Sequence, residues 1–84
     1  MQKKSIFTRE YPVLLELLRE VRGRANVTQV GLAELLGRSQ SFVSKCERGE
    51  TRLDLVQLRE VCRALNKPFL EFVREYERRL TASR

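Results

Sequence analysis

The sequence predicts an all-α fold of five helices in a single domain, and three observations support this class. Apolar residues recur at intervals of three and four along almost the whole chain, as they do on amphipathic helices. Alternating runs typical of strands are nearly absent. With 84 residues, 42% of them hydrophobic, the chain can form one small core. We therefore expect one domain over residues 1–84 with its core in 10–80, and frayed ends at 1–6 and 81–84.

The first helix is predicted to begin between Thr8 and Pro12 and to end near Arg24. Proline is tolerated only in the first turn of a helix, so Pro12 limits where the start can lie. Asn26 suits the left-handed position that closes a helix. The apolar stripe of this helix comprises Val13 or Leu14, Leu17, Leu18 and Val21.

Two short helices follow, and Gly37 separates them. Thr28 can cap the second helix by accepting a hydrogen bond from a free amide of its first turn, and Ser39 can cap the third in the same way. Gly37 stops the second helix because glycine tolerates the positive φ of a helix end. The third helix should end at Arg48 and Gly49. The expected inward residues are Leu32, Ala33, Leu35 and Leu36 on the second helix and Phe42, Val43 and Cys46 on the third.

Capping residues also mark the last two helices. Asp54 followed by Gln57 is a capping-box pattern that starts the fourth helix, and Asn66 with Lys67 ends it. Pro68 fits the first turn of the fifth helix. The apolar stripes comprise Leu55, Leu58, Val61, Cys62 and Leu65 on the fourth helix and Phe69, Phe72, Val73, Tyr76 and Leu80 on the fifth.

The net charge narrows the class of partner. A charge of +6 favours a polyanion such as nucleic acid. A membrane surface is less favoured, because Glu71, Glu75 and Glu77 interrupt the basic residues of the last helix. No apolar run approaches the roughly 20 residues that span a bilayer. No secretory signal precedes the first helix, so we expect a cytoplasmic protein.

Catalysis, metals and cofactors are not indicated. The chain has no histidine and only Cys46 and Cys62 as thiols, so it cannot assemble the usual four nitrogen or sulfur ligands of zinc. It also lacks a plausible pair of nucleophile and base and a phosphate-binding glycine loop, so we expect neither an enzyme nor a cofactor. Both cysteines fall on apolar helical faces, where a buried reduced thiol is favoured over a disulfide or a redox switch.

The stretch TQVGLAELLGRSQSFVSKCERGE has a spacing that suits two short helices meeting at a steep angle. Such a pair needs a small residue at the contact, a residue that tolerates positive φ in the turn, and apolar residues that hold the second helix down. Ala33, Gly37 and the pair of Val43 and Cys46 meet these needs in that order.

Here the chain resembles the lambda-repressor-like, Cro-type helix-turn-helix family of DNA-binding regulators. The resemblance covers roughly residues 14–72 and includes the stretches LLREVR, ANVTQ, GLAELLG, SQSFVSKCERGE and DLVQL. It implies a five-helix fold whose recognition helix, over 39–48, lies in the major groove while the second helix crosses the backbone. It further implies base contacts by Gln40, Ser41, Ser44 and Lys45, and phosphate contacts by Gln29, Arg38 and Arg52.

The resemblance also implies an ion pair between Arg22 and Glu47, which in family members links the first helix to the end of the third. A bidentate pair there would fix the orientation of the recognition helix, and this structural role is the preferred interpretation. The chain departs from the commoner family pattern at Gly31, Leu53 and Cys46. None of these three residues is a proposed base contact, so we expect the departures to affect the stability of the fold before they affect function.

Several features of the sequence have a second interpretation. The polar face of the third helix could be a solvated surface, and Gln29 could be only a good helix former. The apolar side of the fifth helix could pack on its own core, or it could form a two-fold dimer interface, for which Leu35 is another candidate. The candidate interface residues on that helix are Phe69, Phe72, Val73, Tyr76 and Leu80.

The residues and the resemblance together predict a homodimeric transcriptional repressor of bacterial, phage or plasmid origin, associated with the nucleoid. Its partner would be a palindromic double-stranded operator with half-sites about 34 Å apart. A restriction-modification controller protein and an antitoxin with a toxin partner are versions of this function. The rival from another class is a helical protein-interaction module that keeps the fold and does not bind DNA.

Overall fold

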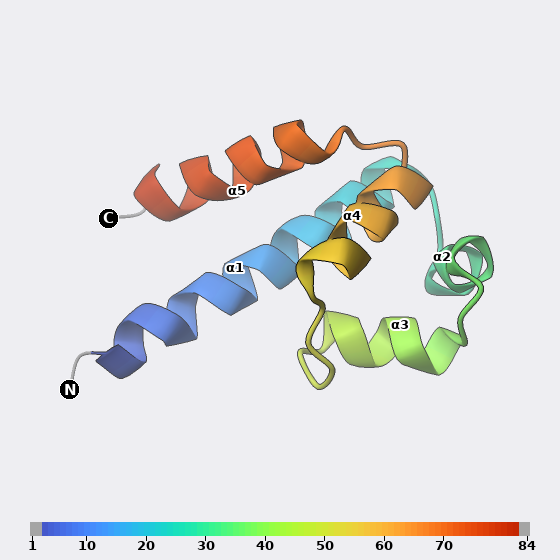
Figure 1. The fold of residues 1–84 in the computed structure, drawn as a ribbon, viewed down its shortest axis with the longest axis horizontal. Helices are drawn as coiled ribbons and strands as arrows, with labels where there is room; N and C mark the ends of the chain where they lie inside the picture. The colour runs from blue at the N-terminus through green and yellow to red at the C-terminus, as the bar shows by residue number, and fades with distance from the viewer. Residues whose placement is uncertain (1–2, 83–84) are drawn as a thin grey trace.

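The computed structural model describes residues 3–82, and within this range it contains helices and no strands, which confirms the all-α class. The helices are α1 (Lys3–Arg24), α2 (Gln29–Leu36), α3 (Gln40–Glu47), α4 (Leu55–Ala64) and α5 (Phe69–Ala82). The two longest, α1 and α5, lie side by side in opposite directions, and their outer ends project together beyond the shorter helices (Figure 1). The helix α3 lies on the side of the molecule away from α5 (Figure 1).

The core lies where the helices converge. Leu17 of α1, Cys62 of α4 and Phe72 of α5 are completely buried, with relative exposures of 0%, 1% and 1%. Burying a leucine or phenylalanine side chain contributes about 1.5–3 kcal/mol each. Helices as short as α2 and α3, with 8 residues each, are not stable alone and depend on this packing. The rest of the buried cluster comprises Leu18, Val21, Leu32, Ala33, Val43, Val61 and Leu65.

The predicted caps are confirmed. Thr28 Oγ1 accepts a hydrogen bond from the amide of Gly31 at 2.9 Å, and Ser39 Oγ accepts one from Phe42 at 3.1 Å. Asp54 and Gln57 form the complete capping box at the start of α4. Gly37 ends α2 with φ of +68°, and Asn26 and Asn66 also have positive φ, at 60° and 59°, where α1 and α4 end. Local chemistry therefore sets the helix boundaries from residue 24 onward.

The predicted start of the first helix is wrong. The helix begins at Lys3, so Pro12 lies inside it and not in its first turn. An internal proline removes one backbone hydrogen bond and costs about 3 kcal/mol. Two hydrogen bonds with α5 lie close to this proline: Tyr76 Oη donates to the carbonyl of Glu10 at 2.9 Å, and Arg9 Nη2 donates to the carbonyl of Leu80 at 2.7 Å.

The ends that were predicted to fray, 1–6 and 81–84, overlap with the first and last helices. Residues 3–6 belong to α1 and 81–82 to α5, while 1–2 and 83–84 lie outside the described residues.

Two leucines predicted to face inward are exposed. Leu35 is 59% exposed because Leu32, Ala33 and Leu36 define the buried side of α2, and position 35 lies about 100° away from its middle. Leu55 is 68% exposed because it is the first residue of α4 and lies beyond the edge of the core. Leu53 packs against the core in its place.

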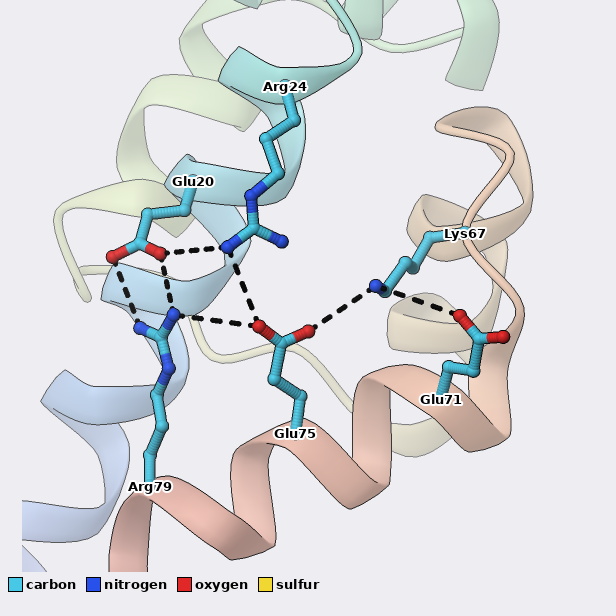
Figure 2. A network of polar contacts seen from close by, with 6 residues as sticks. All are labelled: Glu20, Arg24, Lys67, Glu71, Glu75 and Arg79. Carbon is cyan, nitrogen blue, oxygen red and sulfur yellow. Dashed lines mark hydrogen bonds and ion pairs between the residues drawn. The ribbon is translucent and has the colours of Figure 1, made fainter. Parts of the chain in front are cut away.

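A network of charged side chains joins α1 to α5 (Figure 2). Arg79 Nη2 lies 2.6 Å from Glu20 Oε1, and Arg24 bridges Glu20 and Glu75 at 3.3 and 3.5 Å. Lys67, just before α5, lies 3.3 Å from Glu75. The hydrogen bond and charge of Arg79 lower the pKa of Glu20. Burial opposes the ionised form of Glu75, but the Lys67 hydrogen bond and nearby cations outweigh it, so this pKa is also lowered.

Candidate nucleic-acid interface

The polar face predicted for the recognition helix is open to solvent. Val43 and Cys46 hold the other face of α3 against the core, at 3% and 5% exposure. Gln40, Ser41 and Lys45 are exposed and Ser44 is half-buried. Their face of α3 is therefore not covered by the described part of the chain, as major-groove entry requires.

The end of α3 is tied to α1 through a buried carboxylate. Glu47 is 7% exposed, and both its oxygens accept from Arg22, with Nε to Oε2 at 2.7 Å and Nη2 to Oε1 at 3.0 Å. The predicted bidentate ion pair is thus present. Arg22 also donates to the carbonyl of Val27 at 3.0 Å, and Arg19 donates to the carbonyl of Glu47 at 2.9 Å. These bonds set the position of α3 relative to α1.

Two glutamine amides connect the start of α3 to the same carboxylate. Gln40 Nε2 donates to Gln29 Oε1 at 3.3 Å, and Gln29 Nε2 donates to Glu47 Oε1 at 3.0 Å. A primary amide has two N–H donors and one carbonyl acceptor. Gln40 therefore keeps its amide oxygen and one N–H free of partners among the described residues. Bidentate recognition of adenine needs one acceptor and one donor of this kind. Gln29 keeps one N–H free of partners among the described residues.

The phosphate candidates at the two ends of α3 are stacked on aromatic rings. The guanidinium carbon of Arg38 lies 4.1 Å from the ring centroid of Phe42, and that of Arg52 lies 4.2 Å from the ring centroid of Tyr11. Both arginines are exposed, and no carboxylate among the described residues forms an ion pair with either. Sequence reasoning found the arginines and missed Tyr11, because no spacing rule connects residues that are 41 positions apart.

Arg48 is a further basic residue at this surface, and it was not predicted as a contact. It donates to Ser44 Oγ and holds Glu50 with two bonds of 2.8 and 3.2 Å. The hydrogen bond and charge of Arg48 lower the pKa of Glu50. The charge of Arg48 is thus paired with Glu50, and the Ser44 hydroxyl accepts a hydrogen bond within the chain.

Comparison with known proteins identifies the family. A family model for a helix-turn-helix domain matches residues 13–68, which is more than half of the chain. An XRE-family like protein from Pseudomonas syringae pv. tomato str. DC3000 is 41% identical, with a TM-score of 0.84 over 89% of this chain and 92% of that one. The chain belongs to the XRE-like helix-turn-helix family. No curated protein matches it.

Membership places this XRE-like chain among the helix-turn-helix DNA-binding regulators. The matched range contains α2, the Gly37 turn and α3, together with all the proposed base and phosphate contacts. Tyr11 and α5 lie outside it. None of the helices in the described part of the XRE-like chain has the length and apolar character needed to cross a membrane.

Helix α5 of the XRE-like chain uses most of its apolar face internally. Phe72 is 1% exposed in the chain's own core, so its assignment to a dimer interface is wrong. Phe69 and Tyr76 are half-buried and pack against the same core, and Leu80 is half-buried. Among the five candidates Val73, at 39% exposure, is the exposed one. The large apolar content of α5 is explained by its packing, because the helix covers the long α1.

Both cysteines of the XRE-like chain are buried free thiols, as the sequence predicts. Burial raises the pKa of Cys62 to about 11 and also raises that of Cys46. A thiol reacts through its thiolate, so both side chains are poor nucleophiles at neutral pH. They act as small apolar residues of the core.

Proposed function

We propose that this protein is a sequence-specific transcriptional regulator that binds double-stranded DNA with α3 in the major groove. The observation that carries the proposal is the open face of α3 with Gln40 at its start. Its free oxygen and N–H suit adenine N6 and N7, and the network to Glu47 holds the amide in place. A merely solvated glutamine would need neither this support nor its position as the first residue of the second helix of a helix-turn-helix.

The other side chains of this face complete the contact. Lys45 is exposed one turn after Ser41 and suits guanine O6 and N7, while Ser41 and Ser44 accept more than one base. Gln29, Arg38 and Arg52 bind phosphates, and Gln29 does so with the amides at the N-terminus of α2 beside it. Phosphate contacts set register and affinity, whereas the base contacts supply the specificity.

We propose further that the protein acts as a homodimeric repressor. Two copies related by a two-fold axis would address palindromic half-sites about 34 Å apart, and occupancy of the operator would block transcription in the cytoplasm. The support is an exposed apolar pair on α5, Leu70 at 67% and Val73 at 39%, together with Leu35 at 59% on α2. Restriction-modification controllers and antitoxins share this fold, and co-purification with the product of a neighbouring gene tests for a toxin partner.

Selection from a random duplex library followed by fluorescence polarisation tests the proposed function. Gln40→Ala should lose about 1–3 kcal/mol on the selected site and relax the preference at one base pair. Arg52→Ala should weaken binding to all sequences alike and reduce the slope of log K against log salt by about 0.9. Arg78→Ala removes the same charge from an exposed site on α5 and serves as the control.

The outcomes separate the two classes of function. A protein that selects no sequence and binds no duplex at low salt is an interaction module, and the DNA proposal is then wrong. If Gln40→Ala instead weakens all sequences equally, Gln40 does not contact a base, although DNA binding itself stands.

A further inference from the structure

Tyr11 of α1 contacts two consecutive residues of the segment that follows the recognition helix. Its ring lies under Arg52, with 4.2 Å between the guanidinium carbon and the ring centroid. Its hydroxyl oxygen accepts a hydrogen bond from the amide of Leu53 at 3.2 Å. One side chain thus holds both the backbone and an exposed cation of the segment between α3 and α4.

We propose that Tyr11 is a positioning residue for DNA binding, which holds the Arg52 guanidinium ready for a backbone phosphate at the C-terminal end of α3. The proposal rests on the proposed function and adds to it a residue outside the range that matches the helix-turn-helix family. Tyr11 itself need not touch DNA.

The chemistry of a stacked guanidinium supports this role. The group is planar, so stacking occupies its face and leaves the N–H donors at its edge free for a phosphate. Arg48, four residues earlier, differs in this respect, because its N–H donors already bond to the Glu50 carboxylate at 2.8 and 3.2 Å. No carboxylate among the described residues accepts a hydrogen bond from the N–H groups of Arg52. The ring therefore limits the motion of the cation without consuming its charge.

The backbone contact adds a second restraint. Leu53 packs against the core with its side chain and donates its amide to Tyr11 Oη, so the residue that follows Arg52 is anchored twice. Tyr11 reaches this segment because α1 extends as far back as Lys3 and carries Pro12 within it. If the first helix began after Tyr11, its N-terminal turns would not hold the ring in this place.

Arg38 offers a matched comparison at the other end of α3. It stacks on Phe42, at 4.1 Å, whereas the contacts of the Tyr11 side chain are with Arg52 and Leu53. A variant of Tyr11 should therefore interact energetically with variants of Arg52 and not with those of Arg38. A general loss of stability would not discriminate between the two arginines, so this contrast separates positioning from simple folding.

The test is a double-mutant cycle on duplex affinity, measured over a range of salt concentrations with unfolding followed in parallel. Arg52→Ala should weaken binding roughly tenfold and lower the salt slope by about 0.9. Tyr11→Leu should lose nearly as much affinity as Arg52→Ala and lower the salt slope nearly as far. The double variant of Tyr11→Leu with Arg52→Ala should bind no more weakly than Arg52→Ala alone. Tyr11→Leu combined with Arg38→Ala should be additive. Tyr11→Phe keeps the ring and should retain most of the affinity.

Arg52→Lys provides a second variant at an exposed site where folding is not at risk. It keeps the charge and loses the planar stack. In the native chain it should therefore lose most of the affinity that Arg52 contributes, whereas in the Tyr11→Leu background it should cause little further loss of affinity. The inference is overturned if Tyr11→Leu weakens binding equally in the Arg52→Ala background, if it leaves affinity unchanged, or if Arg52→Lys binds like the native protein. Failure of the native protein to bind any duplex would instead overturn the proposed function, and this inference with it.

Discussion

Replacing Glu47 by glutamine should destabilise the protein strongly, although the two side chains have nearly the same shape. The carboxylate is 7% exposed and accepts three hydrogen bonds, two from Arg22 and one from Gln29. An amide oxygen at the Oε1 position can keep the bonds from Arg22 Nη2 and Gln29 Nε2. The amide nitrogen would then oppose the Nε donor of Arg22, whose side chain is only 19% exposed.

The magnitude follows from leaving a half-buried cation without its partner. Removing one member of a buried ion pair costs about 3–5 kcal/mol, and the partial exposure of Arg22 places Glu47→Gln near 3 kcal/mol. For a domain of this size each kcal/mol shifts the melting temperature by about 4–8 °C, so the variant should melt at least about 12 °C lower. That is a large part of a typical stability of about 5–15 kcal/mol.

Thermal and urea unfolding followed by circular dichroism measure this effect. The double variant Arg22→Met with Glu47→Leu is the informative control, because an apolar pair of similar volume removes the uncompensated charge and should recover much of the loss. A loss below about 1 kcal/mol for Glu47→Gln, or a double variant less stable than Arg22→Met or Glu47→Leu alone, would refute the view that the buried pair holds α3.

Three further predictions follow from the fold. Gly37→Ala should cost about 1 kcal/mol from backbone strain alone, because φ is +68° and no atom lies within 4 Å of the added Cβ; an unchanged urea midpoint would contradict this. The pKa values of Glu20 and Glu75 are lowered from 4.5 in the folded protein, so their contribution to stability is complete above that pH and is lost as the pH falls through the lowered values. Urea unfolding between pH 7 and 2 should show this loss in the native protein and less of it in Glu20→Gln, and equal pH dependence in both would count against the network. Val73→Asp should weaken self-association by at least about fivefold in sedimentation equilibrium with little change in melting temperature, and a native protein that stays monomeric would remove the dimer proposal.

The helix boundaries show how far local chemistry reaches. Thr28, Ser39 and Asp54 each satisfy an amide within three residues, so their roles are visible in the sequence and the structure confirms them. The start of α1 could not be found in this way. Pro12 carries a local signal against an internal position, whereas the contacts with α5 just before it, at Arg9 and Glu10, come from residues more than 60 positions away along the chain.

The same division runs through the candidate site. The identity and helical register of Gln40, Ser41, Ser44 and Lys45 follow from residue spacing, because the caps and the turn glycine that set the bounds of α2 and α3 act within a few positions along the chain. The amide chain through Gln29 and the ring of Tyr11 beneath Arg52 join residues 11 to 41 positions apart. Such pairings depend on how the helices pack against one core. Sequence periodicity shows only which side of a helix is apolar, so it could not predict them. Local sequence therefore specified which side chains form the proposed DNA-binding surface, and tertiary packing decided which of them are held in place and which apolar residues remain exposed.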